Sequence, residues 1–133
     1  DPFLPPMSDL NPSRAVTCTQ MEKLARAIEA FRNSENAYSK EIPAQVIATF
    51  LYVASHDDCN KIDMERELEL SSASGSRNTD WLSDQHRLGK PGLGLIVKYR
   101  DRTNRRRQIL QLTAKGRQLA NTMKQILYGE QTV

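Results

Sequence analysis

The sequence predicts a mostly α-helical domain that carries a small β-sheet of two or three strands toward its carboxyl end. Two observations lead to this fold class. Over most of the chain, apolar residues recur at spacings of three and four, which is the period of an amphipathic helix. Between Leu95 and Leu112 the period changes to two on either side of a charged turn, which is the pattern of a β-hairpin. A chain of 133 residues suits a single domain of this kind.

The hairpin is the most informative stretch of the chain. Residues 95–99 alternate between two faces, and residues 109–112 form a second apolar run. The turn between them holds five arginines and a turn-favouring asparagine: Arg100, Arg102, Asn104, Arg105, Arg106 and Arg107. Thr113 suits the N-cap of a following helix, because its hydroxyl can accept a hydrogen bond from a first-turn amide. A two-stranded ribbon that ends in arginines and leads into a helix has the form of the wing in a winged helix.

The charge of the chain is unevenly distributed. The net charge of +3 is too modest to establish nucleic-acid binding by itself. Residues 98–107, however, hold six basic side chains against one acidic one, whereas residues 57–69 hold six acidic side chains against two basic ones. Basic charge gathered on one element is the electrostatic footprint that a nucleic-acid ligand requires, although a solvated charge run has the same composition.

The amino-terminal part predicts a tail followed by a long helix. Residues 1–13 hold four of the six prolines and are expected to form a flexible tail. One interpretation of residues 1–6, which precede Met7, is a cloning remnant. A helix is expected from Arg14 to Asn33. Its apolar stripe follows the helical period and comprises Cys18, Met21, Leu24, Ala25, Ile28 and Phe31.

The middle of the chain predicts a core helix and then a short helix. Residues 44–55 are apolar nearly all round, which places this helix at the centre of the core, with Pro43 in its first turn. Asn60 suits the cap of a short helix that ends near Leu68. Cys59 is expected in a short strand as a buried small hydrophobe, and the alternative for it is a redox-sensing thiol.

The next helix completes a helix-turn-helix pattern. Ser71 or Ser72 can cap it, it continues through residues 73–83, and Trp81 and Leu82 are expected to face the core. Two short helices joined by a tight turn, the second rich in serine, arginine and asparagine, indicate a helix-turn-helix. The exposed face of the second helix is expected to offer side chains to phosphates and base edges: Ser72, Ser74, Ser76, Arg77 and Asn78, with Asp80 beside them.

Three short motifs at the carboxyl end occur together at a characteristic spacing. They are Gly94-Leu95-Ile96, Asn104-Arg105-Arg106 and Thr113-Ala114-Lys115-Gly116. With these motifs the sequence resembles the MarR family of bacterial winged-helix regulators, whose wing has Asp-Arg-Arg where this chain has Asn104-Arg105-Arg106. Ser74, Arg77 and Leu82 also occupy recognition-helix positions of the family pattern.

The resemblance implies how such a protein would meet DNA. The recognition helix would enter the major groove, and the wing would reach phosphates or the minor groove. The wing residues implied in this contact are Arg102, Asn104, Arg105, Arg106 and Arg107. Arg105 is the strongest candidate among them and Arg102 the next, whereas Arg106 could instead pair with Asp101 across the turn.

Two features depart from the family pattern. Gly75 stands where the family prefers an apolar residue, and it would either allow the backbone to approach DNA closely or mark a loosely held helix. The link from Ser83 to Leu93 is longer than the usual one and is expected to form an extended loop before the wing. Its GKPGLG sequence lacks the spacing of a phosphate-binding loop. The longer link leaves the angle between wing and recognition helix open.

The last helix is expected from Thr113 to Tyr128, within a domain of residues 14–128 and before a short tail of residues 129–133. In the MarR family the terminal helices pair across a two-fold axis. The residues implied in a homodimer interface are Met21, Leu24, Ile28, Leu119, Met123, Ile126 and Leu127. The alternative is that the two terminal helices pack only on each other within one chain.

Together these features predict a dimeric, sequence-specific regulator of transcription that binds double-stranded DNA and needs no cofactor. The alternative is a winged helix that serves as a protein-interaction or architectural module, because fold alone does not fix function. Acidic residues on the first helix of the helix-turn-helix favour that alternative, since they would repel phosphate at a groove: Asp63, Glu65, Glu67 and Glu69. The resemblance also permits a small-molecule effector, but the aromatic and methionine residues fit core positions better than a ligand site: Met21, Phe31, Phe50 and Tyr52.

Other functional classes find less support. No serine–histidine–aspartate or cysteine–histidine arrangement stands out, so no catalytic role is assigned. The two cysteines, Cys18 and Cys59, and the two histidines show no zinc-ligand spacing, and the cysteine usage fits a reducing cytoplasm. No apolar run approaches the roughly 20 residues of a membrane span. We therefore expect a cytoplasmic protein with neither a metal site nor a membrane segment.

Overall fold

A computed structural model describes residues 12–34, 41–84 and 91–129, with side chains from Thr19 onward. The described residues form five helices and three strands. In chain order these are α1 (Pro12–Arg32), α2 (Ala44–Ala54), β1 (Cys59–Asn60), α3 (Lys61–Glu67), α4 (Ser72–Leu82), β2 (Ile96–Arg100), β3 (Gln108–Leu112) and α5 (Ala114–Tyr128). The predicted fold class is confirmed, and every predicted helix has its counterpart within a few residues.

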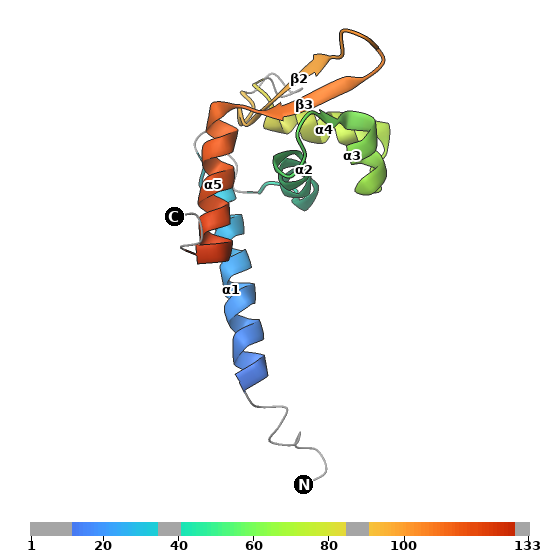
Figure 1. Ribbon diagram of the computed structural model, residues 1–133. Helices are drawn as coiled ribbons and strands as arrows, with labels where there is room; N and C mark the ends of the chain where they lie inside the picture. Colours follow the sequence, from blue (N-terminus) through green and yellow to red (C-terminus); the bar gives the residue numbers. More distant parts are fainter. Residues whose placement is uncertain (1–11, 35–40, 85–90, 130–133) are drawn as a thin grey trace, which may run out of the picture.

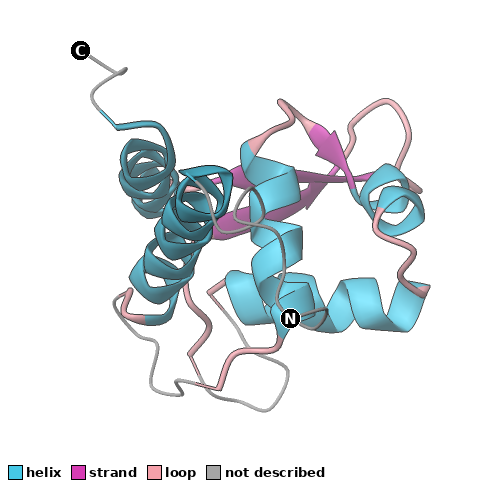
Figure 2. Ribbon diagram, turned by 90° about the horizontal axis from the view of Figure 1, so that it is seen from below, coloured by secondary structure: helices cyan, strands magenta, loops and turns pink. Residues whose placement is uncertain are grey.

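The elements form two parts that differ in shape. Helices α1 and α5 pack side by side, and α1 continues well past the end of α5 (Figure 1). Helices α2, α3 and α4 gather on one face of the three-stranded sheet, beside the paired terminal helices (Figure 2). Among the described residues, no helix combines the length and the apolar character needed to cross a membrane.

Helix α2 lies at the centre of the core, as its apolar sequence predicts. Val46, Phe50 and Val53 are buried on the side that faces the rest of the domain. The ring of Phe31, from α1, meets the ring of Phe50 edge to face, with ring centroids 5.2 Å apart. This aromatic contact joins α1 to the three-helix part, and each ring adds a large apolar area to the core.

The sheet is antiparallel with the strand order β1-β3-β2. Cys59 pairs with Leu110 in β3, which confirms the short strand that was predicted at Cys59. Ile96 and Leu110 are buried on the inner face, whereas Val97 and Tyr99 are exposed on the outer face. The period-2 pattern of the hairpin therefore separates a core face from a solvent face.

The predicted helix caps are present at three helices. Asn60 accepts a hydrogen bond from the amide of Ile62 at the start of α3, and Ser71 accepts from the amide of Ser74 at the start of α4. At α5, Thr113 accepts from the amide of Gly116 and its hydroxyl also donates to the carbonyl of Gly94 at 2.8 Å. The hydrogen bond from Thr113 to Gly94 fixes the start of α5 to the segment that leads into β2.

The apolar stripes of the terminal helices are only partly covered within one chain. On α5, Leu119 and Met123 are buried, and Ile126 and Leu127 pack against the core. On α1, Ile28 is half-buried, whereas Met21 and Leu24 keep 66% and 49% of their surface exposed. Packing of α1 on α5 thus accounts for the α5 stripe and leaves part of the α1 stripe uncovered. The predicted tails at residues 1–11 and 130–133 lie outside the described residues.

Candidate nucleic-acid interface

The start of α4 holds its polar side chains in an ordered chain of contacts. The hydroxyl of Ser71 donates to Oγ of Ser74 at 3.1 Å, and a guanidinium nitrogen of Arg77 donates to the same Oγ at 3.0 Å. Ser72 and Arg77 are exposed, and Ser74 and Ser76 are half-buried. Four of the five predicted contact residues on this helix therefore lie at the surface, with Arg77 oriented by Ser74.

Asn78 is the exception, and its predicted exposure is wrong. Its side chain is buried, with 5% of its surface exposed, and its amide nitrogen lies 3.4 Å from Oγ1 of Thr49 and 3.5 Å from Oε1 of Gln45. Both partners belong to α2. Asn78 thus holds α4 against the core helix, and we remove it from the set of candidate base contacts.

Two further residues of the helix-turn-helix are also buried. Gly75 faces α3, so neither of the two roles considered for it, approach to DNA or a loosely held helix, fits its position. Glu65 was expected among the surface acids of α3, but it is buried in an ion pair with Lys61. The acidic surface of α3 is consequently reduced to Asp63 and Glu67, with Glu69 in the turn that follows, and Asp63 pairs with Arg66.

Asp101 organises the tip of the wing. Its Oδ1 accepts hydrogen bonds from the amide of Thr103 at 2.9 Å and from the hydroxyl of Thr103 at 2.8 Å. These hydrogen bonds, with a smaller contribution from the charge of Arg107, lower the pKa of Asp101. Arg107 lies 3.4 Å from Oδ2 of Asp101. The arginine that pairs with Asp101 is therefore Arg107, and the pairing considered for Arg106 is wrong.

The remaining contacts of the tip close the turn without using the side chains of three of its arginines. Oδ1 of Asn104 accepts from the amide of Arg106 at 3.1 Å, and a guanidinium nitrogen of Arg100 donates to the carbonyl of Arg105 at 2.8 Å. Asn104 thus shapes the turn through the acceptor that an aspartate would also supply. Arg102, Arg105 and Arg106 are exposed, and within the described part of the chain their guanidinium groups enter no ion pair.

A lysine connects the wing to α4. Nζ of Lys98, on β2, donates to Oδ1 of Asp80 at 2.8 Å and to Oγ1 of Thr79 at 3.1 Å. Asp80 was expected to face solvent, but it is half-buried in this contact. Lys98 was not predicted as a site residue. A charged residue at an inward position of a strand was the available signal, because such a residue is rarely buried without a partner.

The extended link between α4 and β2 is closed at its base. Four backbone hydrogen bonds run between residues 81–84 and residues 92–95, with donor–acceptor distances from 2.7 to 3.1 Å. They place the end of α4 directly against the entry to β2. These hydrogen bonds thus help to set the angle between the wing and α4. Residues 85–90 lie outside the described residues.

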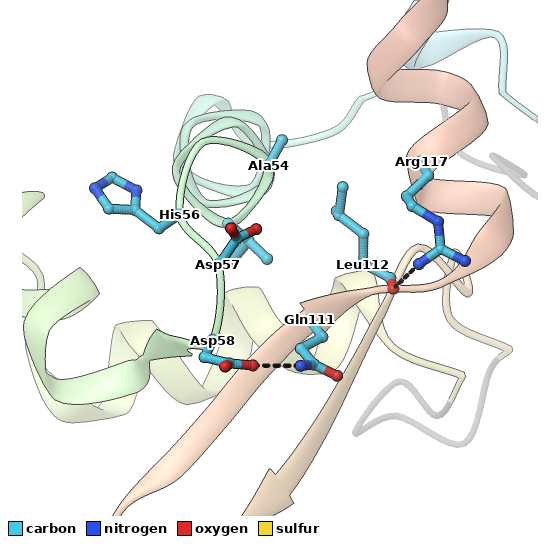
Figure 3. A pocket seen from close by; sticks show the side chains of 8 residues that line it. Ala54, His56, Asp57, Asp58, Gln111, Leu112 and Arg117 are labelled. Atoms are coloured by element: carbon cyan, nitrogen blue, oxygen red, sulfur yellow. Dashed lines mark hydrogen bonds between the residues drawn. The ribbon is translucent and has the colours of Figure 1, made fainter.

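A cavity of about 440 Å³ lies between the end of α2, β3 and the start of α5 (Figure 3). Its lining is mixed: Asp58 accepts a hydrogen bond from Gln111, and Arg117 donates to the carbonyl of Leu112 at 3.2 Å. His56 points away from these groups in Figure 3, and its Nδ1 lies 2.8 Å from the carbonyl oxygen of Tyr52. These side chains form no nucleophile–base arrangement.

Cys59 has the properties of a structural residue. Its side chain keeps 2% of its surface exposed, and burial raises the pKa of its thiol to about 11. The thiolate is the reactive form of cysteine, so this thiol is poorly suited to sense oxidants at neutral pH. Within the described ranges, no group of three or more metal-ligating side chains comes together.

Comparison with known proteins identifies the fold. No family model matches the sequence, and no curated protein matches it. Among solved structures, a MarR transcriptional regulator from Methanosarcina mazei Go1 superimposes with a TM-score of 0.56 at 20% identity, over 86% of this chain and 72% of that one. The chain has the fold of a MarR regulator.

Several of the similar structures contain DNA. The MepR–DNA complex from S. aureus matches with a TM-score of 0.61 at 21% identity, over 90% of this chain and 87% of that one. FabT from Streptococcus pneumoniae, in complex with DNA, matches with a TM-score of 0.57 at 20% identity, over 90% and 72% of the two chains. In this MarR fold, α3 and α4 form the helix-turn-helix and β2–β3 form the wing.

Proposed function

We propose that this protein is a MarR-family transcriptional regulator that binds double-stranded DNA as a dimer and reads its sequence. The observation that carries the proposal is the connection through Lys98, which joins an arginine-bearing wing to a recognition helix whose exposed face is polar. Two surfaces that can meet DNA are thereby held in one fixed relation. The DNA complexes of MepR and FabT, which share the fold, support the same function.

The proposed mechanism is physical. The exposed face of α4 enters the major groove, where Arg77 suits a guanine edge and the serine hydroxyls suit phosphates and bases. Arg105, followed by Arg102, reaches the minor groove from the wing, because a narrow A·T-rich groove has an enhanced negative potential. The wing arginines also displace counterions from phosphates, which supplies affinity that depends on salt.

The proposed dimer rests on the terminal helices. Met21 and Leu24 are exposed apolar residues on α1, and a second chain that covers them would remove apolar surface from water. A two-fold dimer also presents two recognition helices to two half-sites of an inverted repeat. The other residues proposed for this interface, Ile28 and the α5 stripe, would then lie beside the contact.

Selection from a random pool of duplex DNA tests the proposal. The selection is performed at roughly 150 mM salt, where non-specific binding is weakened. We expect enrichment of an inverted repeat whose half-sites lie about one helical turn apart. A pool without any enriched sequence, together with loss of binding at that salt, would falsify the proposed function.

A protein-interaction module is the second candidate. The exposed carboxylates of Glu67, at the end of α3, and Glu69, in the turn after it, favour it because they would repel phosphate if α3 lay at a groove. Elution from heparin separates the two functions. A regulator that binds through the wing should elute at high salt, whereas an interaction module without a DNA surface should elute early.

A further inference from the structure

Gly75 and Glu65 meet where α4 crosses α3. A Cβ atom placed on Gly75 would lie 2.0 Å from Oε2 of Glu65 and 2.6 Å from its Cγ. Both distances are far inside van der Waals contact, so the side chain of Glu65 occupies the space that any other residue at position 75 would need. The glycine allows α3 to bring a glutamate directly onto the backbone of α4.

Glu65 is held in this position by Lys61. Nζ of Lys61 donates to Oε2 of Glu65 at 2.5 Å, and the two side chains are 8% and 10% exposed. If Glu65 swung out toward solvent, Lys61 would remain buried without its partner, which is strongly unfavourable. Lys61 also lies in the first turn of α3, where the helix dipole disfavours a cation. Its position is therefore better explained by the pair than by the stability of α3 alone.

The contact lies beneath the part of α4 that carries the proposed DNA contacts. Gly75 is flanked by Ser74 and Ser76, and Arg77 follows one residue later. The other polar contacts that hold α4, those of Asn78 and of Thr79 with Asp80, lie nearer its carboxyl end. The position of the amino-terminal half of α4 against α3 thus depends on the contact between Gly75 and the side chain of Glu65.

We propose that Glu65, held by Lys61 and seated on Gly75, is a positioning residue that sets how far the amino-terminal half of α4 stands from α3 and hence how its side chains meet base edges. This inference rests on the proposed DNA-binding function. Base contacts need accurate placement, whereas phosphate contacts through a mobile charge do not. A displaced α4 should therefore lose sequence discrimination more than non-specific affinity.

The direction in which Gly75→Ala changes the Tm distinguishes this positioning contact from a simple effect of helix propensity. Gly75→Ala should stabilise an isolated helix, because alanine favours the helix more than glycine does. In this protein it should lower the Tm, since the new methyl group displaces Glu65. In a Lys61→Met/Glu65→Ala background, which removes the pair without leaving a buried charge, Gly75→Ala should instead raise the Tm. Ala73→Gly, at an exposed position of α4, is the control for propensity alone.

The ratio of specific to non-specific DNA affinity is the second measurement. A residue that only stabilised the fold would not change this ratio well below the Tm. Specific and non-specific affinities are measured for each variant well below its Tm, with the duplex selected by the wild-type protein and a scrambled duplex. Gly75→Ala should reduce the ratio of the two affinities roughly tenfold or more, within the usual range between specific and non-specific binding. In the Lys61→Met/Glu65→Ala background the same change should alter the ratio only slightly.

Glu65→Asp supplies a second test if Gly75→Ala fails to fold. It keeps the negative charge but shortens the side chain, so the carboxylate withdraws from Gly75, and the affinity ratio should fall. An unchanged ratio in both Gly75→Ala and Glu65→Asp overturns the inference, and so do additive effects of Gly75→Ala and the background on Tm. A wild-type protein that enriches no sequence contradicts the proposed function instead, so the two failures are distinguishable.

Discussion

Helix α4 and the wing both carry proposed DNA contacts, but they are held in different ways. The inner face of α4 is fixed by side chains from three other elements: α2 through Thr49, α3 through Glu65 and β2 through Lys98. The tip of the wing is fixed from within, by the contacts of Asp101 and Asn104 inside the turn. One surface depends on several other elements of the fold, and the other depends on contacts made within residues 100–107.

This difference matches the two kinds of contact that DNA binding needs. Reading base edges requires a helix at a defined depth and angle, whereas neutralising phosphates requires charge within reach. We therefore expect changes to the supports of α4 to alter stability and sequence discrimination. Changes to the wing should alter affinity and its dependence on salt, with little effect on the stability of the fold.

Lys61→Ala should give the largest effect of the variants that test this comparison. It leaves the carboxylate of Glu65 buried without a partner, which costs about 3 kcal/mol or more in free energy of unfolding. Urea denaturation measures the change. Arg66→Ala is the matched control on the same helix, because its pair with Asp63 is exposed and contributes at most about 1 kcal/mol. Equal losses in the two variants would contradict the support assigned to the buried pair.

Asn78→Ala should give the second largest loss in free energy of unfolding. Removal of the buried amide leaves Thr49 without one partner and should cost about 1–2 kcal/mol. A double-mutant cycle with Thr49→Ala measures the coupling between α4 and α2, and the selected DNA sequence should become less defined. Ser72→Ala, on the exposed side of α4, should leave the free energy of unfolding nearly unchanged. Full additivity in the cycle would argue against Asn78 as a support of α4.

Arg105→Ala should leave the fold intact and weaken DNA binding. The loss should be similar for all sequences, and the slope of log affinity against log salt should shrink by about one unit. Arg26→Ala removes an arginine that is paired with Glu22 on α1 and serves as the control for net charge. An unchanged slope in Arg105→Ala would remove this residue from the interface.

Asp101→Asn should give the smallest effect, which is a change in how the local stability of the wing turn depends on pH. Because the pKa of Asp101 is lowered in the folded protein, its stabilising contribution is complete above the usual aspartate pKa and is lost as the pH falls through the folded value. The protection of the Thr103 amide from hydrogen exchange, measured against the intrinsic rate of an unstructured peptide at the same pH, should therefore fall on acidification in the wild-type protein. The variant should show weaker protection and no such step, and a step of equal size in both proteins would exclude Asp101 as its cause.

Local contacts were the ones that the sequence could predict. The caps at Asn60, Ser71 and Thr113 each join a side chain to an amide two or three residues away, so their pattern is contained in a short stretch. The wing was predictable for the same reason, because its alternation and turn residues occur within one continuous segment.

The supports of α4 could not be predicted in this way. Asn78 meets partners 29 and 33 residues away, and its helix has so few apolar residues that polarity alone did not mark the inner face. The burial of Glu65 depends on Gly75, ten residues later and on another helix. The choice of Arg107 over Arg106 as partner of Asp101 depends on the shape of the turn, which composition does not specify.

The closed base of the link between α4 and β2 has a consequence for how this chain can be altered. The four backbone hydrogen bonds join the two flanking segments directly, so the relation of helix to wing does not depend on the length of chain between them. A peptide tag or a fluorophore-bearing insertion between these two segments should accordingly leave the position of the wing against α4 unchanged. Loop entropy grows only slowly with length, so such an insertion would change the folding free energy little.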